Sequence, residues 1–182
     1  NIDMKGRCPS ERIARDLVRD TMTSFEDEKS AIIVSTFASH ISRIKTITET
    51  AHEMGRKPVL LGRSMERYSS TAEQMKLVSF PQSTSVFGNR RTVERTMRRI
   101  MKTGTEQFVP IVTGNQGEPG AVLTRIVAGE TPYKINKGDK VLFSANVIPN
   151  PMNYGNRYLT EARLKASGAR IFDKLHVSGH AY

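Results

Sequence analysis

Tryptophan is absent from this chain of 182 residues, and aromatic residues make up only 7% of it. A ligand surface built mainly on stacked rings is therefore not expected. The one cysteine, Cys8, cannot form an internal disulfide, which fits a reducing compartment and predicts a cytoplasmic protein. No apolar run approaches the roughly 20 residues of a membrane span, and no signal-peptide pattern is present, so no membrane association is expected.

Acidic residues are too few to balance the bases: 28 Lys and Arg stand against 18 Asp and Glu, a net charge of +10 with a pI of about 10.0. Such an excess favours polyanionic partners, and nucleic acid is the commonest of them. An anionic membrane surface and a merely soluble basic protein are the alternatives. The chain begins at Asn1 without a methionine, so we expect a domain excised from a longer protein.

Strand-like and helix-like segments alternate along the chain. Apolar, β-branched runs predict strands at 31–36, 57–61, 108–112, 140–144 and 170–175. Apolar residues at helical spacing and cap residues predict helices at 10–28, 39–54, 64–76, 90–102, 119–129 and 154–167. Ser10, Ser39 and Ser64 are expected at helix starts, and 78–88 looks irregular. The alternation predicts one α/β domain over 1–182, a Rossmann-like three-layer sandwich with a mainly parallel sheet and helices on both faces.

Ligands of such a sheet bind beyond the carboxyl ends of the strands, so the loops that follow the strands are the candidate sites. The first loop, 35–40, offers the hydroxyls of Thr36 and Ser39 at a helix start, where anions bind, although a plain helix cap is also possible. The second, 61–65, adds Arg63 beside Ser64, which suits a phosphate or else a capped helix with a solvated Arg.

The third loop, 113–120, is rich in glycine and follows an apolar strand. Glycines permit close approach of the backbone to a ligand, but a tight turn explains them equally well. Their spacing fits neither a dinucleotide-binding fingerprint nor a phosphate-binding P-loop. The candidate binding residues here are Gly114, Gln116, Gly117 and Glu118.

A fourth candidate follows the last predicted strand, where His176 and His180 flank Ser178 and Gly179. One imidazole could contact a phosphate while the other transfers a proton near neutral pH. The chain has four His and one Cys and lacks HxHxDH and HExxH motifs, so no complete zinc site is expected within it. Residues 90–102 form a basic helix that could track phosphates or be a solvated face.

In order and spacing, these segments together resemble the β-CASP domain of ribonuclease J, over about residues 30–182. The resemblance is carried by six segments: STFAS at 35–39, GRK with LGRSM at 55–65, TGNQGEP at 113–119, GDKV at 138–141, Ile148-Pro149 and HVSGHA at 176–181. Relatives often carry Asn-Ile-His-Arg where this chain has 40–43, but Arg43 is kept and is carried over as a binding residue.

The resemblance implies a β-CASP domain inserted into a metallo-β-lactamase domain that holds two catalytic zinc ions outside this chain. RNA, preferably with a 5′ monophosphate, would enter a cleft between the two halves. His180 would be the catalytic histidine of this half, while His176, Ser178 and Gly179 would cradle a phosphate. The implied parent is a 5′→3′ exoribonuclease, possibly also an endonuclease, acting as a homodimer in RNA processing and decay, and the isolated chain would be inactive.

Two other functions remain open from the residues. One is a nucleotide- or dinucleotide-binding domain, which the glycine-rich loop and the alternating pattern allow. The other is a non-catalytic module for nucleic-acid binding or dimerisation, and the fold alone does not choose RNA over DNA.

Overall fold

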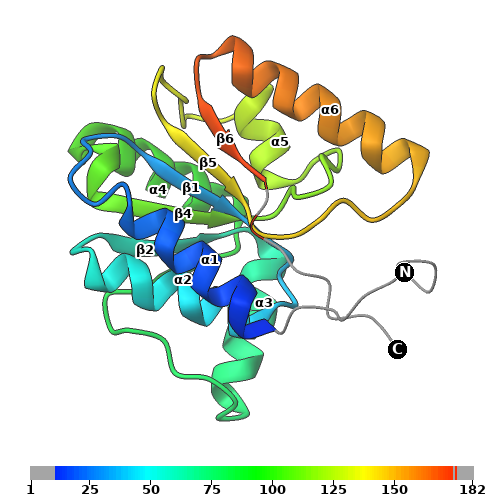
Figure 1. Cartoon of the computed structure of the whole chain (residues 1–182). Coiled ribbons are helices and arrows are strands. Elements are labelled where there is room, and N and C mark those ends of the chain that lie inside the picture. Colours follow the sequence, from blue (N-terminus) through cyan, green and yellow to red (C-terminus); the bar gives the residue numbers. More distant parts are fainter. Residues whose placement is uncertain (1–10, 174, 176–182) are drawn as a thin grey trace.

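A six-stranded parallel sheet forms the centre of the structure, a computed structural model that describes residues 11–173 and 175 (Figure 1). The strands follow the order β3-β2-β4-β1-β5-β6 across the sheet, and every neighbouring pair is parallel. Their bounds are β1 Ile32–Ser35, β2 Lys57–Leu61, β3 Ser85–Phe87, β4 Phe108–Val112, β5 Lys140–Phe143 and β6 Arg170–Phe172. The predicted parallel α/β class is confirmed.

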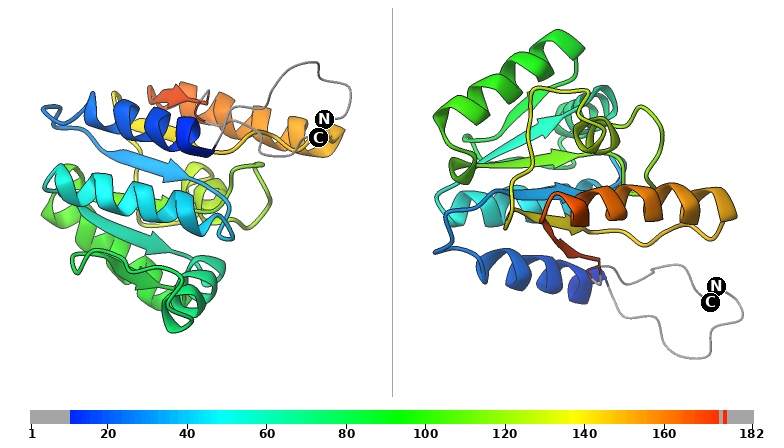
Figure 2. Two further views of the ribbon diagram at one scale, coloured as in Figure 1. Left: turned by 60° about the horizontal axis from the view of Figure 1, so that its bottom comes forward. Right: turned by 90° about the horizontal axis from the view of Figure 1, so that it is seen from above.

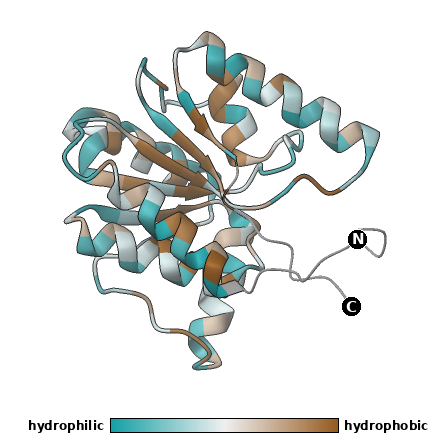
Figure 3. Cartoon of the chain, viewed as in Figure 1, coloured by the Kyte–Doolittle hydropathy of each residue, from teal (hydrophilic) through white to brown (hydrophobic). Residues whose placement is uncertain are grey.

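Helices cover both faces of this sheet, as Figures 1 and 2 show. Their bounds are α1 Glu11–Thr23, α2 Ile41–Glu53, α3 Arg63–Gln74, α4 Arg90–Thr103, α5 Val122–Val127 and α6 Pro151–Ala166, with a short 3-10 helix, η1, at Thr105–Gln107. One apolar cluster joins the sheet to α1–α3, and a second joins its other face to α4–α6. The central strands β1, β4 and β5 are buried from both sides, so their residues are mostly hydrophobic (Figure 3), and the predicted three-layer sandwich is confirmed.

Element boundaries differ from the sequence prediction at several points. The stretch predicted as irregular contains β3, an edge strand of three half-buried residues that is too short to show a pattern. Ser39 does not cap α2, because the chain turns once more and His40 takes the cap position. Likewise α3 begins before Ser64, directly after Gly62. The proposed cap Ser10 lies outside the described residues.

The strand order places a topological switch between β2 and β4. From β2 the chain proceeds to β3 on one side, whereas from the neighbouring β4 it proceeds past β1 to β5 on the other. Connections that diverge in this way open a crevice at the carboxyl ends of the two strands, where ligands of parallel sheets bind. The loops after β2 and β4, both selected from the sequence, therefore lie side by side, and the loop after β1 follows next to that of β4.

Candidate phosphate-binding pocket

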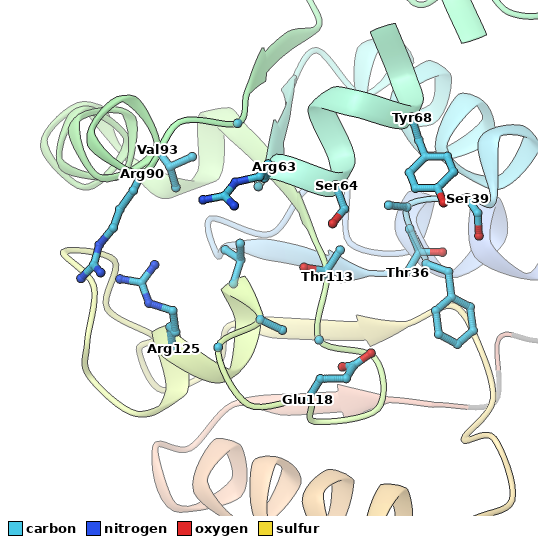
Figure 4. A pocket seen from close by; sticks show the side chains of 18 of the residues that line it. Thr36, Ser39, Arg63, Ser64, Tyr68, Arg90, Val93, Thr113, Glu118 and Arg125 are labelled. Carbon is cyan, nitrogen blue, oxygen red and sulfur yellow. The ribbon is translucent and has the colours of Figure 1, made fainter. Parts of the chain in front are cut away.

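An open cavity of about 670 Å³ lies at this carboxyl edge (Figure 4). The segments that follow β1, β2, β3 and β4 all line it, although they are far apart in the sequence. Six of the predicted binding residues come together there: Thr36, Ser39, Arg63, Ser64, Gly114 and Glu118. The volume is in the range of small-ligand sites and is large enough for a nucleotide.

Three arginines from three helices reach towards one end of the cavity, namely Arg63, Arg90 and Arg125 (Figure 4). Glu94 lies between two of them: its Oε1 accepts from Arg90 Nε at 3.0 Å and from Arg125 Nη2 at 3.3 Å. The hydrogen bond from Arg90, followed by that from Arg125, holds the pKa of Glu94 below its usual value. Within the described part of the chain Arg63 has no such carboxylate partner, so its guanidinium is available to an anion.

A buried hydroxyl also lies at the cavity wall. Thr36 is only 1% exposed, and its amide donates to the carbonyl of Val112 at 3.1 Å, which fixes the end of β1 against β4. Its Oγ1 has no hydrogen-bond partner among the described residues. A buried polar atom without a partner is costly, so a ligand that bonded to Thr36 would be stabilised by relief of that cost. The exposed hydroxyls of Ser39 and Ser64 lie on the same wall.

The glycines of the third loop have a packing role in addition to any contact with ligand. A Cβ built on Gly114 would lie 2.8 Å from Leu123 Cβ, against α5. At Gly117, where φ is +71°, a Cβ would overlap the backbone of Asn156 in α6. The glycines therefore let the loop lie against two helices, and Gly117 does not line the main cavity. The sequence interpretation of close approach to a ligand missed these contacts.

Gln116 is 3% exposed, and both ends of its side-chain amide are engaged. Its Nε2 donates to the carbonyl of Asn146 at 3.0 Å, and its Oε1 accepts from the amide of Ile148 at 2.8 Å. Neighbouring Asn115 donates to the carbonyl of Ala145 at 2.9 Å. Gln116 thus holds the loop after β5 in place, and its predicted contact with substrate stays a prediction. Glu118 stays partly exposed, with one oxygen accepting from the amide of Gln116.

Arg43 is likewise in the interior and is fully buried in α2. Its Nη1 donates to the carbonyl of Ser144 at 2.6 Å and to that of Leu175 at 3.3 Å. It therefore joins the end of β5 to the residue that precedes His176 in the sequence. Arg43 thus helps to position this segment, and its predicted contact with RNA stays a prediction.

His176, Ser178, Gly179 and His180 lie outside the described residues, so their predicted roles stay predictions. Among residues 11–173 and 175, no group of three or more His, Cys, Asp or Glu side chains is placed to hold a metal ion. No helix in this part of the chain is long and apolar enough to cross a membrane.

Two polar residues of the lining, Arg125 and Tyr68, were not selected by sequence reasoning, while Arg90 was selected only as part of the basic helix and Thr113 only as part of the third loop. Arg125 follows the glycine-rich loop on the first helix after it. This position could have identified Arg125 from the sequence as a candidate, because the helix that follows a strand starts at the same edge of the sheet as the loop.

Fold and pocket together define a parallel α/β domain with an open cavity, lined by arginines and hydroxyls, at the carboxyl edge of its sheet. Residues 29–159 match the family described as "Ribonuclease J, beta-CASP domain". Since the match covers most of the chain, the chain belongs to the β-CASP domain family of ribonuclease J.

Relatives named Ribonuclease J are similar to nearly the whole chain. The protein from Methanocaldococcus jannaschii is 49% identical over 180 residues, 99% of this chain and 40% of its own length. The protein from Pyrococcus abyssi is 41% identical over 96% of this chain and 38% of its own length. The protein from Synechocystis is 33% identical over 100% of this chain and 27% of its own length. The chain thus spans about two fifths or less of these relatives.

Proposed function

We propose that this chain is the RNA-binding β-CASP half of a ribonuclease J-like enzyme that cleaves 5′-monophosphorylated RNA from its 5′ end and also within the strand. Membership of the family and the names of the relatives support RNA as the substrate. The net charge of +10 adds support, because RNA is a polyanion.

The observation that carries this proposal is that one cavity is lined by Arg63, which has no ion pair with any described residue, and by Thr36, whose hydroxyl has no hydrogen-bond partner among them. A guanidinium offers two parallel N–H donors that match a phosphate. Arg90 and Arg125 add two guanidinium groups at the far end of the cavity, where Arg90 is paired with Glu94, and Arg125 is paired with Glu94 and Glu130. The pocket would bind one phosphate of the strand and orient the neighbouring nucleotide, independently of base identity.

Two zinc ions would lie in the lactamase half of the complete protein, where they would supply an activated water. No described residue of this chain is grouped to hold them, and none is given a metal-binding role. On this side of the cleft His176, Ser178 and Gly179 would bind the phosphate next to the scissile bond, and His180 would transfer a proton. The isolated chain would then bind RNA without cutting it, and the complete enzyme would act in the cytoplasm.

Cleavage of a 5′-phosphorylated, end-labelled RNA by the complete protein tests this proposal. We expect His180→Ala to abolish cleavage while RNA binding persists, and Arg63→Ala to weaken binding. Arg67→Ala is the matched control, because Arg67 is equally exposed on α3 but does not line the cavity. Unchanged cleavage by His180→Ala would contradict its role, and a thermal shift with NAD or ATP, but none with RNA, would favour a nucleotide-binding domain.

A homodimer is part of the proposed assembly, and α6 offers a surface for it. Residues 152, 155, 159, 162 and 166 are Met, Gly, Leu, Ala and Ala at coiled-coil spacing, and all are exposed. Met152 is 72% exposed and Leu159 57% exposed. In an antiparallel pair about a two-fold axis, Met152 would face Ala162 of the second copy and Leu159 would face Gly155.

Both of these layers join one large and one small side chain, whereas a parallel pair would place large against large. The antiparallel arrangement also keeps the exposed Arg163 and Lys165 of the two copies at opposite ends. Sedimentation of the complete protein tests it: Leu159→Lys should give monomers, and Leu77→Lys should not, since Leu77 is an exposed leucine outside α6. A dimer that withstands Leu159→Lys would exclude this surface.

A further inference from the structure

Helix α4 carries six cationic side chains and one acid on 14 residues. Four of the cations, Arg91, Arg95, Arg98 and Lys102, follow one another at spacings of four, three and four residues, which places them along one side of the helix. All four are exposed, and the buried residues of α4 lie on the opposite side. We call these four residues the α4 stripe.

Within the described part of the chain, no carboxylate forms an ion pair with any member of the α4 stripe. The single acid of the helix, Glu94, is already bonded to Arg90 and Arg125 at the cavity. Like charges three and four residues apart disfavour a helix. The arrangement therefore carries an electrostatic cost that a bound polyanion would remove.

The α4 stripe begins next to a residue that lines the pocket, but on another side of α4 from the lining residue Val93. Arg90 and Val93, in the first turns of α4, line the cavity (Figure 4), and Arg91 is the next residue after Arg90. From Arg91 to Lys102 the helix advances about 16 Å, with about one cation for every 5–6 Å of axis. A chain of phosphates that left the pocket on this side would meet the cations in succession.

We infer that the α4 stripe is a second RNA-binding site, which holds the part of the strand that extends beyond the pocket. This rests on the proposed function, since it takes RNA to be the ligand of the pocket. Three of the four residues are arginines, which bind phosphate through a fork of two N–H groups. Helix α4 has no aromatic residue on which a base could stack, so the stripe reads the phosphate backbone and not the sequence.

The experiment compares a short and a long RNA on the complete protein. Both strands carry a 5′ phosphate and 2′-O-methyl sugars that resist cleavage; one has five nucleotides and fills only the pocket, and the other has twenty. The variant is R91Q/R95Q/R98Q/K102Q. The control, K29Q/K134Q/K137Q/K165Q, also removes four exposed cations, which lie near the amino ends of the strands, away from the pocket. Fluorescence anisotropy is measured across a salt series.

For the long RNA, we expect the stripe variant to bind on the order of tenfold to a hundredfold more weakly at low salt. The slope of log affinity against log salt should fall by about 0.7 for each lost phosphate contact. The short RNA should bind the variant within about twofold of the parent, since it does not reach the stripe. The control variant should retain the slope of the parent for both strands.

Equal weakening of both RNAs, or an effect no larger than that of the control, would mean that the α4 stripe is a solvated face and would overturn the inference. Loss of binding to anionic vesicles with unchanged binding of long RNA would also overturn it, in favour of a membrane surface. The parent protein tests the proposed function separately. If the parent binds neither the short nor the long RNA, the proposed function is wrong, whatever the stripe variant does.

Discussion

Replacement of Gly117 by alanine probes how closely the third loop packs against α6. Both Gly117 and Gly120 have positive φ, +71° and +79°, in the same loop. Alanine in this backbone region costs roughly 1–2 kcal/mol, partly offset by about 0.4–1 kcal/mol from a less flexible unfolded chain. At Gly120 nothing lies within 4 Å of the new Cβ, so the net cost should be about 1 kcal/mol.

At Gly117 the new Cβ would also overlap backbone atoms of Asn156 and Arg157, which cannot rotate away as a side chain can. Overpacking of this kind costs about 1–3 kcal/mol more. Because about 1 kcal/mol shifts the melting temperature of a domain of this size by roughly 2–4 °C, Gly117→Ala should melt about 2–12 °C below Gly120→Ala.

Thermal unfolding of the chain, followed by far-ultraviolet circular dichroism, measures the difference between these two variants. The comparison cancels the shared backbone cost, so it isolates the contact with α6. Equal melting temperatures for the two variants would show that the loop and α6 separate at little cost, and would refute the close packing on which the position of the pocket wall depends.

Three further predictions concern single side chains. Arg63→Ala should weaken RNA binding, measured by fluorescence anisotropy, about tenfold or more, since hydrogen bonds to charged groups contribute about 1.5–3 kcal/mol. The affinity of Arg67→Ala for RNA should stay within about twofold of the parent. Equal effects of the two changes would exclude a special role for Arg63. Glu28→Gln should lower the melting temperature more at pH 7 than below pH 4.5. The hydrogen bond from Lys140 lowers the pKa of Glu28 from its usual 4.5, so the stabilisation by the ionised carboxylate is present above that pH and is lost as the pH falls. A difference in melting temperature that does not change with pH would contradict this. Tyr133→Phe should leave the free energy of unfolding unchanged or raise it by up to about 1 kcal/mol, because it removes a buried hydroxyl that has no partner among the described residues. The same burial raises the pKa of Tyr133. A clear loss of stability in a urea titration would show that the hydroxyl does form a hydrogen bond.

Much of the fold was predictable because its signals are local. The run Lys57–Leu61 and the run Phe108–Val112 match their observed strands in both bounds, since a strand buried on both faces must be apolar throughout. Strand β3 was missed because a short, half-buried edge strand has no continuous apolar run. Helix α6 begins earlier than predicted, at Pro151, where Asn150 accepts from the amide of Met152.

The candidate site was predictable as a set of loops but not as a set of contacts. Thr36, Arg63 and Glu118 come together because parallel strands end at one edge, a rule that needs only the order of elements. That Gln116 bonds to the loop after β5 could not be predicted, since its partners lie about 30 residues away. Arg125 escaped notice because its place beside Glu94 depends on the distance between α4 and α5.

The sequence by itself determined the parallel α/β class, the basic character and the family, because these follow from composition, local periodicity and the order of short motifs. Only the tertiary structure decided which polar residues face the cavity. Arg43 and Arg63 look alike in the sequence, yet Arg43 is fully buried against the carbonyls of Ser144 and Leu175, while Arg63 lines the pocket and has no ion pair within the described part of the chain. The direction of a side chain is set by packing between segments that are far apart in the chain, and the local sequence does not determine how those segments pack.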